Sequence, residues 1–181
     1  MLNFILTSTY FALPAMFANM APVCCKKYLK FLYKPIDGGK TWRGKPILGS
    51  HKTWGGFIVG IITATVVVFL QKLLYQYGSF ANISYINYQK ESAILVGFLL
   101  GFGALFGDAF KSLIKRRFNV KPGDKFFPWD QLDLLIGAGI FISFVKPISL
   151  QMWIFYIGLA LVAHPLANIT GYKLGFKDVP W

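Results

Sequence analysis

The chain has 181 residues and a formal net charge of +12; 55% of its residues are hydrophobic and only 14% are charged. This composition excludes an ordinary soluble globular domain, because a water-exposed surface needs more charged residues than the chain contains. No soluble basic domain carries the excess positive charge, so nucleic acid is not an expected partner. We therefore expect a membrane protein whose basic residues face anionic lipid headgroups or an anionic substrate.

Five apolar runs predict an all-α fold, namely a polytopic membrane protein with five transmembrane helices in a single domain over residues 1–181. A helix from Asp130 to Val145 is about 24 Å long, which is less than a hydrocarbon core of roughly 30 Å. The acidic start of this fourth span is therefore expected below the membrane surface, in a water-filled cavity. The expected spans cover residues 2–23, 54–74, 92–113, 132–145 and 148–170.

The distribution of basic residues predicts the orientation of these spans. Sixteen of the 19 lysines and arginines lie in residues 24–53, in residues 111–125 or in the tail from residue 173, all on the same side of five spans. The positive-inside rule places this side in the cytosol and the N-terminus outside. We expect a multi-pass protein of the cell membrane with its C-terminus, its loops 24–53 and 114–131 and its active site on the cytoplasmic side.

The end of the third span and the start of the fourth carry a concentration of charge. Asp130 and Asp133 share a face of the fourth span, and Arg116 extends the basic end of the third. Carboxylate oxygens suit a hard divalent cation, and basic side chains suit the phosphates that accompany it. The segment predicts a metal–phosphate site at the membrane surface, although plain intrahelical ion pairs are the competing interpretation. The polar face of the third span, at spacing i, i+3, i+4 and i+7, consists of Asp108, Lys111, Ser112 and Lys115.

The first loop contains a second candidate binding element. Six glycines lie between residues 37 and 56, together with Lys52 and Thr53. Such a loop offers backbone N–H groups and cations to a polyphosphate. Its spacing does not match a Walker A motif, so a P-loop hydrolase is not supported. Thr53 has an alternative role as the N-cap of the second span.

Three separated motifs resemble a known enzyme family. Residues 50–56 (Ser-His-Lys-Thr-Trp-Gly-Gly) resemble the Ser-Pro-Lys-Lys-Thr-Trp-Glu-Gly element of phosphatidate cytidylyltransferases, one residue shorter and without the glutamate. Residues 107–112, 115–117 and 130–133 resemble the signature Gly-Asp-x-x-Glu-Ser-x-x-Lys-Arg, which ends in Asp-Arg-x-Asp-Ser.

The resemblance is closer to the compact archaeal-type relatives, the CDP-archaeol synthases. These enzymes have five transmembrane helices. They carry a lysine in place of the signature glutamate, as at Lys111, and a Pro-Gly-Asp segment ahead of Pro-x-Asp-Gln-x-Asp, as in residues 122–133. The resemblance extends through the tail, residues 164–181, and so covers essentially the whole chain.

The resemblance implies an activity and a set of site residues. The family transfers CMP from CTP to a membrane lipid phosphate with the help of Mg²⁺, so it implies CTP, a lipid phosphate and the bilayer as partners. The acceptor is either an archaeal geranylgeranylglycerol phosphate or phosphatidic acid, and the oligomeric state stays open. The implied metal ligands are Asp108, Asp130 and Asp133. The implied catalytic set adds Lys111 and Lys115, and the implied nucleotide-binding set is Lys52, Thr53, Gly55, Ser112, Arg116 and Lys121.

Two other functions account for parts of the pattern. A CDP-alcohol phosphotransferase also uses aspartates and Mg²⁺, but its Asp-x-x-Asp-Gly-x-x-Ala-Arg pattern does not occur in the chain. A small cation-coupled transporter or binding protein is the third possibility. Against it, the sequence shows no inverted repeat, and its charges cluster on one side of the spans.

Overall fold

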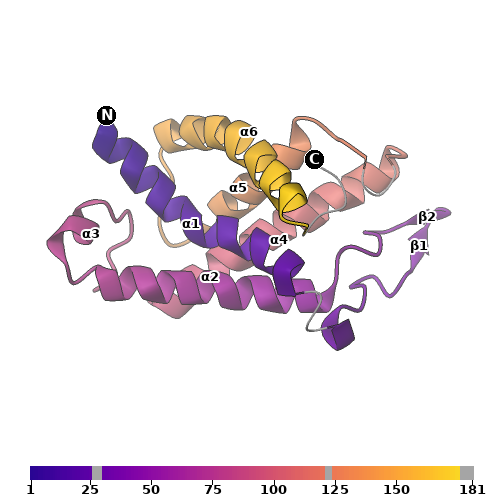
Figure 1. The fold of residues 1–181 in the computed structure, drawn as a ribbon, viewed down its shortest axis with the longest axis horizontal. Helices are drawn as coiled ribbons and strands as arrows, with labels where there is room; N and C mark the ends of the chain where they lie inside the picture. Colours follow the sequence, from indigo (N-terminus) through magenta and orange to yellow (C-terminus); the bar gives the residue numbers. More distant parts are fainter. Residues whose placement is uncertain (26–29, 121–123, 176–181) are drawn as a thin grey trace.

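The computed structural model describes residues 1–25, 30–120 and 124–175, which form a helical bundle (Figure 1). This architecture confirms the prediction of an all-α polytopic protein. The helices are α1 (Leu2–Cys25), α2 (Trp54–Leu74), α3 (Gly78–Asn82), α4 (Ala93–Arg117), α5 (Trp129–Ile142) and α6 (Leu150–Lys173). The first loop adds a 3₁₀ turn, η1 (Lys30–Leu32), and a two-stranded antiparallel hairpin, β1 (Thr41–Trp42) and β2 (Lys45–Pro46).

Three of the long helices begin at a capping hydroxyl. Thr53 Oγ1 accepts a hydrogen bond from the Gly56 N–H at 3.1 Å, which begins α2. Ser92 caps α4 and Ser149 caps α6 in the same way. Each hydroxyl satisfies one of the N–H groups that lack a partner in the first turn, so the helix starts are fixed locally by the sequence.

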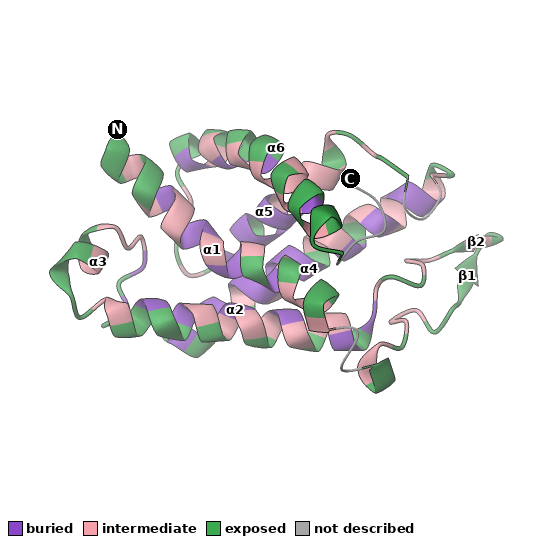
Figure 2. Cartoon of the chain, viewed as in Figure 1, coloured by how far each residue is buried: buried purple, intermediate pink, exposed green. Residues whose placement is uncertain are grey.

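The outer surface of the bundle is apolar. Figure 2 shows exposed residues along α2 and α6, and these include Ile62, Leu73, Ile154 and Leu166. Large exposed aliphatic side chains on this scale are unfavourable in water but suit lipid. By length and composition, α1, α2, α4 and α6 are each able to cross a membrane. The chain is therefore a multi-pass membrane protein.

The fourth predicted span corresponds to α5, which is the shortest helix of the main bundle. It has 14 residues, begins at Trp129 and ends at Ile142, three residues before the predicted end of that span. A helix of this length is about 21 Å long, so it does not cross a hydrocarbon core of roughly 30 Å by itself. A count of five complete spans stays a prediction.

The helix α4 packs against α5, α2 and α1 at the centre of the bundle. Its contact with α5 is a backbone contact, because a Cβ built on Gly103 would lie 2.7 Å from the Gly137 carbonyl oxygen. A Cβ on Gly107 would lie 3.1 Å from the Gly137 Cα and would collide with the Asp133 carbonyl oxygen. Glycines allow such close approach of membrane helices. The charged end of α4 is thereby held directly against the start of α5.

The two charge-rich segments of the sequence meet at one end of the bundle. In Figure 1, α3 and the beginning of α1 lie at one end, and the β1–β2 hairpin lies at the other. The Arg117 carbonyl at the end of α4 accepts a hydrogen bond from Lys45 in β2 at 3.1 Å. The first loop (residues 30–53) therefore packs beside the end of α4, although the two segments are far apart in the sequence.

Replacing Gly137 by alanine tests the backbone contact. We expect Gly137→Ala to destabilise the folded protein by about 1–3 kcal/mol, because the added methyl group forces α4 and α5 apart. The matched control is Gly158→Ala in α6, where an added Cβ meets nothing within 4 Å. Thermal unfolding in detergent should show a lower Tm for the first variant and no decrease for the second. Equal Tm values for the two variants would contradict this packing.

Candidate active site

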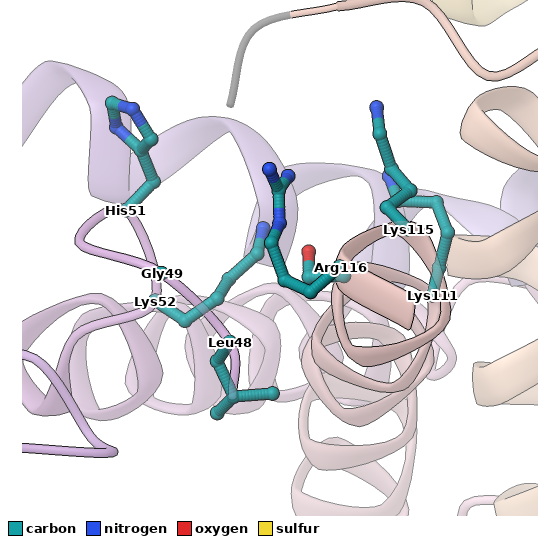
Figure 3. Close-up of a pocket in the computed structure, with 8 residues that line it drawn as sticks. Leu48, Gly49, His51, Lys52, Lys111, Lys115 and Arg116 are labelled. Carbon is teal, nitrogen blue, oxygen red and sulfur yellow. The ribbon is translucent and has the colours of Figure 1, made fainter. Parts of the chain in front are cut away.

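A basic pocket of about 250 Å³ lies between the first loop and the last two turns of α4. In Figure 3, Lys52 extends from the loop side toward the side chains of α4, while Lys115 and Arg116 project from the helix. Segments that are nearly 60 residues apart in the sequence thus form its two walls. The loop supplies Leu48, Gly49, His51 and Lys52, and α4 supplies Lys111, Ser112, Lys115 and Arg116.

The three predicted metal-binding aspartates converge on one lysine beside this pocket. Lys111 Nζ lies 3.1 Å from Asp108 Oδ1, 3.0 Å from Asp130 Oδ1 and 2.7 Å from Asp133 Oδ2. This convergence has two local causes. Asp108 and Lys111 are one helical turn apart on α4, and the other two acids are one turn apart on α5. We call Asp108, Asp130 and Asp133 the aspartate cluster. One ammonium cannot neutralise three carboxylates, so the cluster needs further cations.

Two pocket lysines supply the further cations that the aspartate cluster needs. Lys52 reaches across from the first loop and forms an ion pair with Asp108 Oδ2. Lys115 Nζ lies 3.1 and 3.2 Å from the two oxygens of Asp130 and donates to the Asp124 carbonyl at 2.6 Å. Three lysines therefore balance three aspartates in a region largely withdrawn from solvent.

Arg116 adds a fourth cation that the aspartate cluster does not use. Arg116 is only 8% exposed, and its Nη1 donates a hydrogen bond to the Val120 carbonyl at 2.6 Å. Its Nε is buried and has no hydrogen-bond partner among the residues that the structure describes. Ser112 Oγ donates to the Asp108 carbonyl at 2.9 Å. A buried, partly unsatisfied guanidinium next to balanced ion pairs gives the pocket an excess of positive charge that suits an anion.

The backbone N–H groups of the first loop are used within the loop. Asp37 accepts hydrogen bonds from the N–H groups of Gly39, Leu48 and Gly49 at 2.9 to 3.0 Å. Burial alone would raise the pKa of Asp37, but these N–H donors lower it overall. The sequence suggested that these glycine-rich N–H groups receive a polyphosphate. In the structure the N–H groups of Gly39, Leu48 and Gly49 donate to Asp37, and basic side chains line the pocket.

Some predicted nucleotide-binding residues lie outside the pocket lining. Thr53 is buried and caps α2. Gly55 packs against the end of η1, because a Cβ there would lie 2.9 Å from Leu32 and 2.8 Å from the ring of Tyr33, the next residue. Lys121 lies outside the described residues. The roles predicted for these three residues in nucleotide binding stay predictions.

Sequence reasoning did not single out Leu48, Gly49 and His51, which line the pocket. The available signal was the position of Asp37: a carboxylate at the start of a glycine-rich loop commonly binds backbone N–H groups further along. Gly49 has φ of 94°, a conformation that suits glycine at the turn leading to Lys52.

The aspartate cluster fits the donor chemistry of Mg²⁺, which takes carboxylate oxygens. No three acidic, histidine or cysteine side chains surround a common ion position among the described residues. Lys111 instead lies where the three carboxylates converge. Mg²⁺ is usually held by one or two carboxylates together with substrate phosphates, so a cage of three acids is not needed. Asp108 and Asp130, whose side chains are each 17% exposed against 6% for Asp133, fit such a site.

The polytopic helical fold, with a cluster of acids and bases beside a basic pocket at one end of the bundle, suits a membrane enzyme that acts on phosphate-containing substrates. The fold is similar to a solved structure described as an intramembrane enzyme for archaeal membrane lipids biosynthesis. The TM-score is 0.69 at 26% identity, over 88% of this chain and 91% of that one.

The family model for CarS-like CDP-archaeol synthase matches residues 1–181. The chain is 42% identical to the CDP-archaeol synthase of Thermococcus gammatolerans, over 95% of this chain and 94% of the relative. It is 40% identical to the CDP-archaeol synthase of Thermococcus kodakarensis, over 99% of this chain and 98% of the relative. It is 35% identical to that of Methanococcus aeolicus, over 98% of this chain and 97% of the relative. The chain belongs to the CDP-archaeol synthase family and is a CTP-dependent lipid cytidylyltransferase.

Lys111→Met tests the charge balance of the aspartate cluster. Removing the shared cation leaves three carboxylates with too few partners, so we expect destabilisation by about 3 kcal/mol. Lys111→Arg should retain most of the stability. Thermal unfolding should be compared with Lys90→Met, which removes an exposed lysine in the α3–α4 connection. A Lys111→Met protein as stable as the Lys90→Met control would contradict the assigned balance.

The stability of the first loop should depend on pH through Asp37. A carboxyl group whose folded-state pKa is lowered from its usual value of about 4 stabilises the fold above that value, and this contribution is lost as pH falls through the folded-state pKa. The Tm of the wild type should therefore exceed that of Asp37→Asn by a constant amount from pH 8 to pH 5. The difference should shrink in more acidic buffer. A difference that grows on acidification would contradict the hydrogen bonds assigned to Asp37.

Proposed function

We propose that the chain transfers CMP from CTP to the phosphate of an archaeal-type isoprenoid ether lipid and releases pyrophosphate, in a reaction that requires Mg²⁺. The observation that carries this proposal is the convergence of Lys52, Lys111, Lys115 and Arg116, from two distant segments, on one pocket beside the aspartate cluster. The archaeal ether lipid is favoured over phosphatidic acid because the matched relatives are named CDP-archaeol synthases.

The chemistry requires positioning and charge neutralisation more than proton transfer. A lipid phosphate monoester is ionised near neutral pH, so its oxygen attacks without a general base. A new bond forms between this oxygen and the α-phosphorus of CTP, and the bond from that phosphorus to the pyrophosphate oxygen breaks. Both reactants are polyanions that repel one another, so the main task of the protein is to hold them together in line.

The residues of the pocket are suited to this task. Arg116, with its buried Nε, and Lys115 line the wall on α4 and attract phosphate groups. Lys52 lines the opposite wall, so a triphosphate between the walls would meet cations on both sides. Asp108 and Asp130 would hold Mg²⁺, which when bound would neutralise negative charge on the reacting phosphates. When phosphates enter, Lys52 and Lys111 exchange part of their pairing with carboxylates for pairing with phosphate oxygens.

We place the pocket on the cytoplasmic side of the membrane. The first loop and the end of α4, which form it, carry most of the basic residues of the chain. Under the positive-inside rule this end of the bundle faces the cytosol, where CTP is available.

The first test is CMP transfer by purified protein from radiolabelled CTP, with an archaeal-type ether lipid phosphate and phosphatidic acid offered in parallel. We expect a labelled CDP-lipid with Mg²⁺, predominantly from the ether lipid, and loss of product when EDTA replaces the metal. Predominant labelling of phosphatidic acid would overturn the assigned acceptor class, and no product from either lipid would overturn the reaction.

Asp108→Asn should lower transfer by at least about a hundredfold, because it removes a carboxylate proposed to hold the metal beside the reacting phosphates. The control is Glu91→Gln, which alters an acid in the connection before α4, away from the pocket. Unchanged turnover in Asp108→Asn would contradict the metal assignment.

A further inference from the structure

Arg117, the last residue of α4, lies next to the pocket residues in sequence but binds the β1–β2 hairpin. Its Nη1 donates to the Trp42 carbonyl at 2.7 Å, and its Nη2 donates to the carbonyls of Pro46 at 2.6 Å and Lys45 at 3.3 Å. Its guanidinium carbon also lies 5.0 Å from the centroid of the Trp42 ring. Lys45 returns a hydrogen bond to the Arg117 carbonyl. The contact therefore joins both strands of the hairpin to the end of α4.

This contact fixes one wall of the pocket relative to the other. The hairpin ends at Pro46, two residues before Leu48, where the loop wall of the pocket begins. Asp37 binds the N–H groups of Leu48 and Gly49, so the wall and the base of the hairpin move together. A displacement of the hairpin would therefore displace Lys52, which follows within the same short segment.

The geometry of the contact requires arginine. A guanidinium is planar and directs several N–H groups in fixed directions, so it can bind several carbonyls at once while stacking on an aromatic ring. A lysine ammonium carries the same charge but lacks this planar set of N–H donors in fixed directions. Because three carbonyls already use the Nη groups of Arg117, and because the residue does not line the pocket, its role differs from that of Arg116.

We propose that Arg117 is a positioning residue for nucleotide binding. It holds the first loop against α4 at the separation at which Lys52 and the cations of α4 contact the same triphosphate. This inference rests on the proposed function of the pocket, and it assigns to Arg117 no contact with substrate.

The experiment compares Arg117→Lys and Arg117→Gln with the wild type in two measurements. The first is steady-state CMP transfer with CTP varied. We expect both variants to raise KM for CTP roughly tenfold with a smaller change in kcat, because a misplaced wall weakens binding of the triphosphate. The second is hydrogen–deuterium exchange of residues 40–47 in detergent micelles, where both variants should exchange faster than the wild type. The exchange measurement needs no activity.

The matched control is Arg43→Gln. Arg43 also stacks on the Trp42 ring, with its guanidinium carbon 5.6 Å from the centroid, and it belongs to the same hairpin. The Arg43→Gln substitution removes the same charge but keeps the hydrogen bonds of Arg117 to three carbonyls. The KM for CTP and the hydrogen–deuterium exchange of residues 40–47 should therefore stay near the wild-type values. If the Arg117 variants fail to fold, Lys45→Met, which removes the returning hydrogen bond, should show the same two changes at smaller size.

Two results would overturn the inference. Full recovery of KM in Arg117→Lys, with loss only in Arg117→Gln, would mean that charge alone matters. Unchanged exchange in residues 40–47 of the folded variants would mean that Arg117 does not hold the hairpin. Failure of the proposed function would be seen separately, as absence of CMP transfer by the wild-type protein, while the exchange result would still report on the hairpin.

Discussion

The backbone contact between α4 and α5 is the constraint on which the rest of this structure depends. Carboxylates on one helix reach an ammonium on another only if the two axes are close, and Gly103, Gly107 and Gly137 remove the side chains that would keep them apart. Asp130 and Asp133 of α5 can then share Lys111 with Asp108 of α4. These side chains are largely withdrawn from solvent, so each charge needs a partner within the protein.

The resulting site pairs its carboxylates with lysines and keeps a surplus of positive charge. Three lysines pair with the aspartate cluster, while Arg116 retains a buried N–H group without a partner among the described residues. Under the proposed function, incoming phosphates would meet cations that are already in place, and Lys52 and Lys111 would exchange part of their pairing with carboxylates for pairing with phosphate oxygens. The same ion pairs that join α4, α5 and the first loop thus also gather cations beside the pocket.

Much of this arrangement was predictable from local features of the sequence. The spacing of Asp108, Lys111 and Lys115 put them on one helical face, and the apolar runs located the long helices. The use of Thr53 as an N-cap was an open alternative because a single hydroxyl suits either role. The hydrogen bonds of Asp37 and the binding of the hairpin by Arg117 were not predictable, since both depend on tertiary contacts between segments that sequence spacing does not relate. The helix α5 ends at Ile142, whereas the predicted span continued to Val145 because Phe144 and Val145 are apolar.

The length of α5 has a consequence for the lipid around the protein. Its 14 residues lie beside helices of 21 to 25 residues, so its length falls short of a typical hydrocarbon core by about 9 Å. Such hydrophobic mismatch is met by thinning of the adjacent leaflet or by shielding from neighbouring helices. Thinning at the charged end of the bundle would lower nearby headgroups toward the pocket. The thickness of the surrounding bilayer then becomes a variable in how readily a lipid phosphate reaches the nucleotide.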